Sequence, residues 1–462
     1  MKNNDYSTSD KYETVILGGQ VIDVVKGVTA IQNIGINNGK IAAISKGFLE
    51  GWKEINANGL LVSPGFIDFH SHVDGNPYAG KCMVMQGGTT TLGGERDLNR
   101  KTFRRIEEEG FIINQGFSVS HSFVLRSAVG ITNPHQPATD QEIKIMADLA
   151  RSFLESGAFS ICFVLELIPG TSKKELIEVA KVAKEYDRLV TVHMRKDGRE
   201  ALQHFDELLE LASMGVKLHL LQLMYMVGIG GAMEPALQIL DAAIASGLDI
   251  TADSGVYDAY TVCIGTGVFE EGWEKEYGTA SVEDLVISSG TFMGEHCTEQ
   301  LFHRLRKEFP ATLVTAFVCD KEAIPMALKR DYVYCSTNAT DGPYYPGMGA
   351  PEVSGTFPRL LGKYVREHRQ LSLMEAIRKI TILPARRYGL QDVGSLEVGK
   401  NADIVIFDPE EIIDQSTFIG RGKPDEPPKG ITYVLVNGEV VVEKGQLTEN
   451  LSAGRLVLCN YG

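Results

Sequence analysis

Two histidines separated by one residue form the sharpest chemical pattern in the sequence. His70 and His72 end the run GFIDFHSH, residues 65–72. In an extended strand, side chains two residues apart lie on the same face, so we expect both imidazoles to converge at the strand end. Converging imidazoles suit a divalent metal, and a pair of solvated loop histidines is the alternative. Asp68 shares their parity and could orient a metal ligand through a hydrogen bond.

Two more histidines lie in apolar, strand-like runs and are predicted to add metal ligands. His193 ends the run LVTVH, and His219 lies in VKLHLLQL. For His219, a buried and hydrogen-bonded core histidine is the alternative. Gln222 follows His219 by three residues and has the opposite parity, so only one of the two can face inward without a bulge.

Carboxylates near other predicted strand ends could complete this site. Asp341, in STNATDG, is predicted to bind metal and to act as general base toward a water molecule, with an Asp-Gly turn as the alternative. Glu95, in LGGERD, is predicted to bridge two metals, or else to be a solvated turn residue. Glu166, in FVLELIPG, is costly to bury without a partner, so it either belongs to the site or points outward.

Several other side chains are candidates for contacting a substrate. His121 lies in a strand-like run and could line the pocket, and Tyr257 lies in a loop, residues 256–295, that we expect to cover the pocket. The cations that could bind a substrate carboxylate are Arg195, Arg126 and Lys196. The predicted substrate-binding residues are Arg195, Glu166, His121 and Tyr257.

The elements that must position these residues alternate between strands and helices. Runs such as FSICFVLEL and LVTVHM are apolar and rich in β-branched residues, which indicates buried strands. Runs such as KELIEVAKVAKEY and EPALQILDAAIA have apolar residues at helical spacing. This alternation predicts a (β/α) barrel or a doubly wound sheet. The dinucleotide-binding version is disfavoured because no GxGxxG motif follows the first strand.

The two ends of the chain read instead as short strands joined by turns. Asn38-Gly39 and Asn437-Gly438 are hairpin signals within them. We predict that residues 1–63 and 391–462 join into one small β domain and that residues 64–390 form the inserted barrel.

Composition sets the broad class of the protein. The chain has 462 residues, long enough for a large barrel and an accessory domain. Its 45 Lys+Arg against 60 Asp+Glu give a net charge of -15, which argues against a general nucleic-acid binder. The seven scattered cysteines, without a CxxC pair, favour the cytoplasm. We expect no membrane span, because no run of 18 apolar residues occurs, and the sequence is compatible with a homo-oligomer.

These motifs also carry a family resemblance. PGFIDFHSH, LVTVHMRKDG, SGTFPRLLGKYVRE and GSLEVGKNADIVIFD resemble the amidohydrolase superfamily, and most closely the N-acyl-D-amino-acid deacylases, or D-aminoacylases. The resemblance extends over most of the chain. It implies a distorted (β/α)8 barrel, a β-sandwich built from both termini, and one or two zinc ions. It also implies that His70 and His72 are the first-strand ligands, His193 the fifth-strand ligand, and Asp341 the eighth-strand acid/base.

The sequence departs from the family pattern at three places. Where the family has a cysteine ligand, this chain has GGERD, and Glu95 is the expected substitute. In LHLLQLMYM, Gln222 could take the place of the family's sixth-strand histidine, and the lysine that would hold a substrate carboxylate is missing. No lysine lies in FSICFVLEL, which argues against the carbamylated-lysine bridge of hydantoinases and dihydroorotases.

The expected activity is metal-dependent hydrolysis of a C–N amide bond, with an N-acyl-D-amino acid as the favoured substrate. The predicted metal ligands are His70, His72, Glu95, His193, His219 and Asp341, and Asp341 is the predicted catalytic acid/base. A cyclic-amide hydrolase is the main alternative. A deaminase, and a barrel scaffold that lacks metal and activity, are the remaining ones.

Overall fold

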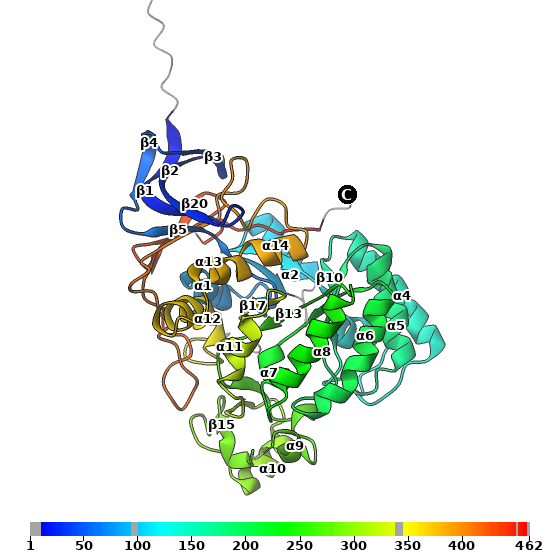
Figure 1. Cartoon of the computed structure of the whole chain (residues 1–462). Coiled ribbons are helices and arrows are strands. Elements are labelled where there is room, and N and C mark those ends of the chain that lie inside the picture. The colour runs from blue at the N-terminus through cyan, green and yellow to red at the C-terminus, as the bar shows by residue number, and fades with distance from the viewer. Residues whose placement is uncertain (1–10, 94–99, 279, 338–344, 450, 460–462) are drawn as a thin grey trace, which may run out of the picture.

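The computed structural model describes residues 11–93, 100–278, 280–337, 345–449 and 451–459. A barrel occupies the middle of the molecule, with a large β-sheet at one end and a small inserted sheet at the other (Figure 1). Among the described residues, no helix has the length and apolar character needed to cross a membrane.

Eight parallel strand positions form the wall of the barrel. Seven consecutive parallel pairings link these positions, and β8 and β9 occupy one of them together. The first and last positions are joined because Thr337 donates hydrogen bonds to Asp68. The predicted distorted (β/α)8 barrel is therefore confirmed. Its strands are β6 (Phe66–Asp68), β7 (Gly88–Gly93), β8 (Asn114–Phe117), β9 (Val119–Ser120), β10 (Ser160–Val164), β11 (Leu189–His193), β12 (Lys217–Leu220), β13 (Ile250–Ser254) and β17 (Val333–Cys335).

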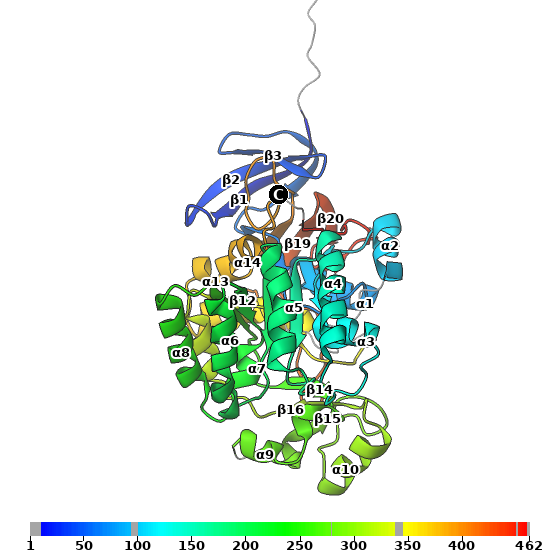
Figure 2. The same cartoon turned by 90° about the vertical axis from the view of Figure 1, so that its right-hand side faces the viewer.

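Helices pack around the outside of these strands (Figure 2). In α5, Ser172 caps the N-terminus by accepting a hydrogen bond from the Glu175 backbone N–H, and the apolar residues at helical spacing are buried toward the barrel. The main helices are α1 (Pro77–Met85), α2 (Arg100–Glu109), α3 (Arg126–Ala128), α4 (Asp140–Glu155), α5 (Lys173–Glu185), α6 (Phe205–Ser213), α7 (Leu223–Val227), α8 (Met233–Ala245), α11 (Ala323–Leu328), α12 (Glu352–Arg359), α13 (Leu373–Lys379) and α14 (Ile382–Arg387).

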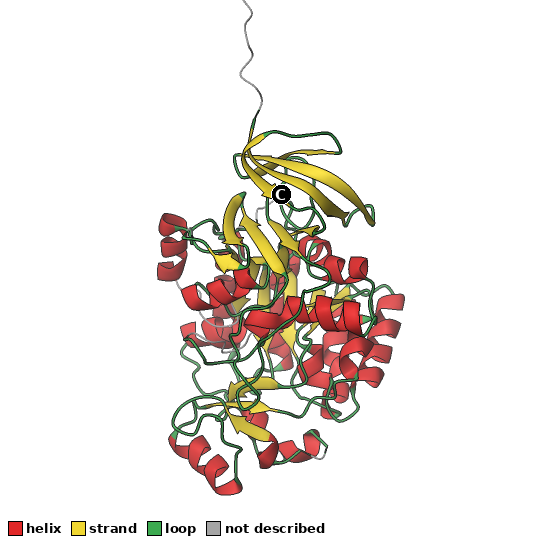
Figure 3. Ribbon diagram, turned by 90° about the vertical axis from the view of Figure 1, so that its left-hand side faces the viewer, coloured by secondary structure: helices red, strands yellow, loops and turns green. Residues whose placement is uncertain are grey.

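Strands from both termini form one nine-stranded sheet (Figure 3). The two halves meet where β5 pairs with β18 in antiparallel register. Both predicted hairpin turns are confirmed, because Asn38-Gly39 and Asn437-Gly438 have positive φ at each residue, as a tight two-residue hairpin turn requires. The strands are β1 (Tyr12–Asp23), β2 (Val28–Asn37), β3 (Lys40–Ser45), β4 (Gly51–Asn56), β5 (Leu61–Pro64), β18 (Ile404–Phe407), β19 (Ile431–Val436), β20 (Glu439–Glu443) and β21 (Gln446–Leu447).

The last described residues leave this sheet and return to the barrel. Gly454 bridges Phe111, and the backbone N–H of Gln115, on β8, donates to the carbonyl of Arg455. The domain prediction assigned this segment to the small β domain, whereas its backbone hydrogen bonds are made to the barrel. Extended residues at a chain end can satisfy their polar groups against any free strand edge, and the sequence pattern does not say which edge.

An insertion between β13 and β17 forms a small antiparallel sheet, β14 (Tyr260–Cys263), β15 (Leu285–Ile287) and β16 (Leu313–Ala316). It carries α9 (Trp273–Glu276) and α10 (Glu299–Glu308) and lies at the end of the barrel opposite the nine-stranded sheet (Figures 1 and 3). The segment predicted as a covering loop is thus a folded unit with its own aromatic core, in which Phe269, Trp273 and Phe302 pack edge to face or tilted.

Candidate active site

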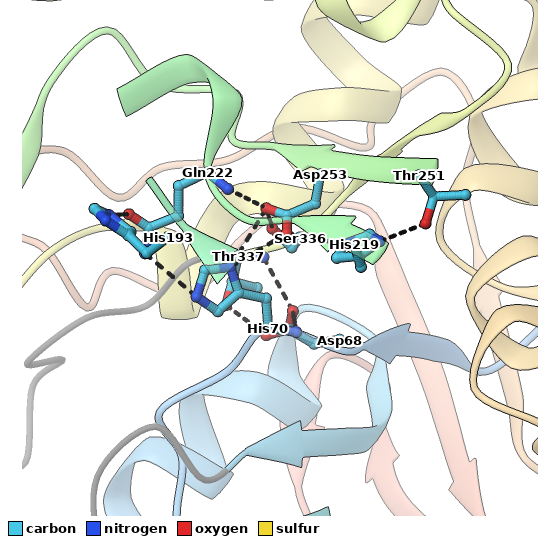
Figure 4. A network of polar contacts seen from close by, with 9 residues as sticks. All are labelled: Asp68, His70, His193, His219, Gln222, Thr251, Asp253, Ser336 and Thr337. Carbon is cyan, nitrogen blue, oxygen red and sulfur yellow. Dashed lines mark hydrogen bonds and ion pairs between the residues drawn. The ribbon is translucent and has the colours of Figure 1, made fainter. Parts of the chain in front are cut away.

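Two imidazoles meet one amide at the carboxyl ends of the barrel strands (Figure 4). The Nε2 atom of His193, the last residue of β11, lies 2.8 Å from Oε1 of Gln222. The Nε2 atom of His70, just after β6, lies 3.3 Å from Nε2 of Gln222. The Gln222 amide therefore bridges the two imidazole rings. In (β/α)8 barrel enzymes the active site lies at the carboxyl ends of the strands, and these three side chains meet at that end.

The backbone at Gln222 explains why this residue faces the site. Its φ of 61° is in the left-handed region, which non-glycine residues rarely adopt. This turn breaks the alternation that would otherwise place His219 and Gln222 on opposite faces. The parity argument from the sequence therefore does not hold beyond Leu220, where β12 ends.

His219 has the environment of a buried core histidine. Its ring is fully buried, with Nδ1 2.8 Å from Thr251 Oγ1 and Nε2 3.1 Å from Asp253 Oδ2. Burial lowers the pKa of His219 and outweighs the attraction of Asp253. Gln222, rather than the predicted ligand His219, is thus the sixth-strand residue that contacts both His70 and His193.

Asp253, at the end of β13, is the hub of the polar cluster. It accepts hydrogen bonds from the Ser336 hydroxyl at 2.7 Å and from the Gln222 backbone N–H at 3.1 Å. Nδ1 of His70 lies 3.4 and 3.3 Å from its two oxygens. Burial opposes ionisation, yet the electrostatic attraction of His70 and the hydrogen bonds from His219 and His70 hold the pKa of Asp253 well below its usual range. The sequence reasoning missed Asp253, although an acid ending the apolar run LDITADS was a signal for it.

Asp68 holds the backbone in place at Thr337 and His70 through hydrogen bonds. It accepts from the backbone N–H of Thr337 at 3.1 Å, from the Thr337 hydroxyl, and from the His70 backbone N–H at 3.4 Å. Burial raises the pKa of Asp68 to about 6, against the opposing hydrogen bonds from Thr337. Asp68 was expected to orient a metal ligand, but Asp253 is the residue that contacts the His70 ring.

The predicted metal ligands are placed only in part. His72 is buried, and its ring centroid lies 5.8 Å from that of His70. Glu95 and Asp341 lie outside the described residues. Within the described ranges, no three His, Cys, Asp or Glu side chains converge closely enough to hold a metal ion. The imidazoles that are present have the right chemistry for a divalent metal.

A pair of buried carboxyl groups lies beside His193. Glu166 Oε2 is 3.4 Å from Nδ1 of His193, so this residue faces the site rather than solvent. Burial and the neighbouring charge of Asp197 raise the pKa of Glu166 well above its usual value. Burial also raises the pKa of Asp197 to about 7, although hydrogen bonds from Glu166 and Tyr277 oppose the shift. The pair therefore retains a proton near neutral pH, and Tyr277 links it to the insertion.

The other predicted substrate contacts are engaged elsewhere. His121 is fully buried, stacked on Phe163 at 4.4 Å, with Nε2 2.9 Å from Glu175. The Tyr257 hydroxyl donates to Asp414 at 3.2 Å. Both side chains are buried and hold these partners inside the protein.

The three candidate cations each have a carboxylate partner within the protein. Arg195 donates to Glu207 at 2.6 Å, and Lys196 lies 2.8 Å from Glu276. Arg126 pairs with the same Glu175 carboxylate that contacts His121. None of these three cations is thus left over for a substrate carboxylate.

Comparison with known proteins places this site in a family. The family model described as "Amidohydrolase family" matches residues 136–442, more than half of the chain. The chain is 28% identical to N-acyl-D-glutamate deacylase and 27% identical to D-aminoacylase, both from Alcaligenes xylosoxydans xylosoxydans, over 93% and 98% of each chain respectively. It also superposes on the crystal structure of N-acyl-D-glutamate deacylase from Bordetella bronchiseptica, complexed with zinc and a phosphonate inhibitor, with a TM-score of 0.85. That match has 24% identity and covers 97% of this chain and 100% of the other.

The similarity extends through both the barrel and the terminal sheet, and the predicted class of enzyme, a hydrolase of C–N bonds other than peptide bonds, is confirmed. The chain belongs to the amidohydrolase family.

Proposed function

We propose that the protein is a metal-dependent deacylase of N-acyl-D-amino acids. The observation that carries the proposal is the meeting of His70 and His193 at Gln222, at the carboxyl end of the barrel. The similarity to two deacylases over nearly the whole chain supports the substrate class.

We assign the metal-binding role to His70, His72 and His193, with Glu95 and Asp341 as carboxylate ligands. Imidazole and carboxylate together are the usual ligands of zinc, which is the proposed metal. Gln222 takes the sixth-strand position in place of His219. Because an amide is not among the usual zinc ligands, we propose one tightly held ion rather than two.

The chemistry supplied by a bound divalent ion is activation of a water molecule and polarisation of the scissile carbonyl. Asp341 is assigned to accept the proton of the attacking water and to deliver it to the leaving nitrogen. Asp253 holds the proton of His70 on Nδ1, so that the Nε2 lone pair points into the site. The residues from three strands thus keep one imidazole in a fixed tautomer and orientation.

A second candidate function is hydrolysis of a cyclic amide. The pairing of Arg195, Arg126 and Lys196 with carboxylates favours it, because an N-acyl-amino acid needs a cation for its carboxylate and a neutral ring does not. The same residues would serve either substrate, since both reactions add water to an amide carbonyl.

The function is tested by assaying N-acetyl-D-amino acids, their L enantiomers, and hydantoin and dihydropyrimidine rings with zinc-loaded enzyme. We expect turnover of the D series and a loss of about three orders of magnitude or more in kcat for Asp341→Asn. The conservative change Asp331→Asn, at an exposed position, is the control. Turnover of the cyclic amides alone would favour the second candidate, and near-normal activity of Asp341→Asn would contradict the assigned acid/base.

We also propose that the enzyme acts in the cytoplasm. All seven cysteines lie within the described residues and none is in a disulfide, as a reducing compartment favours.

A further inference from the structure

A large groove lies between the barrel and the insertion. Its volume is about 960 Å³, within the usual range of small-molecule pockets. Three segments form its walls: the turn and loop after β9, the residues that follow β10, and the start of the insertion after β14. His70, His72 and His193 are not among the described residues that line it.

The lining of this groove is mainly apolar, with Phe123, Val124, Ile131, Pro134, Leu167 and Ile168 among its residues. Its charged groups already have partners. Arg126 donates to Glu175 and to the carbonyl of Gln136, and His135 pairs with Glu270 at the rim. A ligand of this groove would therefore meet hydrocarbon surface and no available cation.

The groove adjoins the catalytic cluster through the residues after β10. The backbone N–H of Leu165 donates to the carbonyl of His193 at 3.0 Å, and the Glu166 side chain lies 3.4 Å from the His193 ring. Leu167, the next residue, lines the groove. Gly267, on the opposite wall, also lies close to Glu166. A Cβ atom placed on Gly267 would be 3.5 Å from the backbone carbonyl oxygen of Glu166.

A shared apolar cluster makes the same connection. Phe123 and Leu167 of the groove pack on Cys162, Val164 and Leu221. Of these, Cys162 and Leu221 line a small cavity inside the barrel together with His70. One side of the cluster thus lines the groove, and the other side lines the small cavity that His70 also lines.

We propose that this groove binds the acyl group of the substrate and that the enzyme prefers apolar acyl groups longer than acetyl. The inference rests on the proposed deacylase function. The acyl half of an N-acyl-amino acid is uncharged, whereas the amino-acid half carries a carboxylate, so the half without charge fits a groove whose cations are already paired. Each methylene group buried in the groove contributes hydrophobic binding free energy.

The first test is a chain-length series of N-acetyl-, N-butanoyl- and N-octanoyl-D-alanine. We expect kcat/KM to rise by at least about tenfold from acetyl to octanoyl, the effect of burying about two methylenes. Ala128→Trp, at an exposed position of the lining, should lower this octanoyl-to-acetyl preference by about tenfold because the indole fills the groove. Ser127→Trp, also in the lining, is the second variant, and Ala242→Trp, exposed on α8, is the matched control that keeps the preference.

The second test measures binding without hydrolysis. The probe is 2-nonanone, a neutral ketone whose carbonyl carries the same alkyl chain as the octanoyl group and which cannot be hydrolysed, titrated by NMR into the intact enzyme. We expect the wild-type protein and Ala242→Trp to bind it equally, and Ala128→Trp and Ser127→Trp to bind it at least about tenfold more weakly.

The outcomes separate the two proposals. Ketone binding that both groove variants weaken, without turnover of any N-acyl-amino acid, would support the groove as an apolar-chain site and contradict the deacylase function. Turnover of N-acetyl-D-alanine with no chain-length preference and no ketone binding would support the deacylase function and overturn the groove assignment. A change of preference for the amino-acid side chain in Ala128→Trp, with the acyl preference intact, would also overturn it.

Discussion

The two imidazoles at the centre of the site have opposite carboxyl partners. His70 faces Asp253, whose pKa is held below its usual range by His70 and His219. His193 faces Glu166, whose pKa is raised by burial and by Asp197. One side of the site is therefore a fully ionised and hydrogen-bonded hub, and the other is a pair of carboxyl groups that keeps a proton. Asp253 thus fixes the ring of His70, whereas the Glu166–Asp197 pair beside His193 is the part of the site that titrates.

Removing the hub should have the largest effect. Asp253→Ala leaves the Ser336 hydroxyl, the His219 Nε2 atom and the Gln222 backbone N–H without their acceptor in a buried space. We expect the free energy of unfolding to fall by about 3 kcal/mol or more, measured by urea denaturation. The control is Asp148→Ala, whose exposed carboxylate pairs with Arg151 and should cost only about 0–1 kcal/mol. Equal losses in the two variants would contradict the role of Asp253 as hub.

Replacing the Gln222 amide, which lies between the two imidazole rings, should have the next largest effect. Gln222→His adds an imidazole between His70 and His193, and we expect metal to be retained at least about tenfold better during dialysis against a chelator, the scale on which metal-site partners change affinity. Gln222→Asn keeps an amide and should show no gain. Unchanged retention in Gln222→His would mean that the amide does not occupy a ligand position.

The titrating side predicts a pH dependence of stability. The pKa of Asp197 in the folded protein, about 7, lies above the value of 3.8 expected when it is unfolded, so the protonated form favours folding. This contribution is complete below about pH 4 and is lost as the pH rises through about 7. Relative to the wild type, Asp197→Asn should therefore gain stability between pH 4 and 7, measured by urea denaturation across that range. Parallel stability curves for the two proteins would contradict the raised pKa.

The smallest effect is expected at the paired cation on the loop after β11. Arg195 donates to Glu207 and both side chains are only slightly exposed. If Arg195 serves this ion pair and not the substrate, Arg195→Gln should change KM for N-acetyl-D-alanine by less than about threefold. A rise in KM of more than about tenfold, with kcat unchanged, would instead make Arg195 the carboxylate-binding residue.

The residues that could be predicted from the sequence are those whose signal is local. The pair His70 and His72 and the ligand candidate His193 stand at strand ends, and strand–helix alternation indicated a barrel or a doubly wound sheet. The two hairpin turns could also be predicted from Asn-Gly pairs, because a tight two-residue turn requires positive φ at both residues. Local signals thus indicated the class of fold and the first candidate residues of the site, and the family resemblance implied the closed barrel.

The rest of the candidate site depends on tertiary features that a sequence pattern does not contain. A left-handed residue at Gln222 places it beside His193 and leaves His219 in the core, which no parity rule anticipates. The ion pairs of Arg195 and Lys196 join segments that are distant in sequence or in different elements. Tertiary contacts of this kind decide which of several suitable side chains is available for chemistry.

The most direct test of the account is the metal content per chain of chelator-free protein, measured by elemental analysis together with the rate on N-acetyl-D-alanine. The account predicts about one equivalent of zinc in the wild type, loss of zinc and activity together in His70→Ala and His193→Ala, and retained zinc in His303→Ala, an exposed histidine on α10. A wild-type protein that hydrolyses the amide with no metal bound, or that keeps its zinc in both active-site variants, would contradict it.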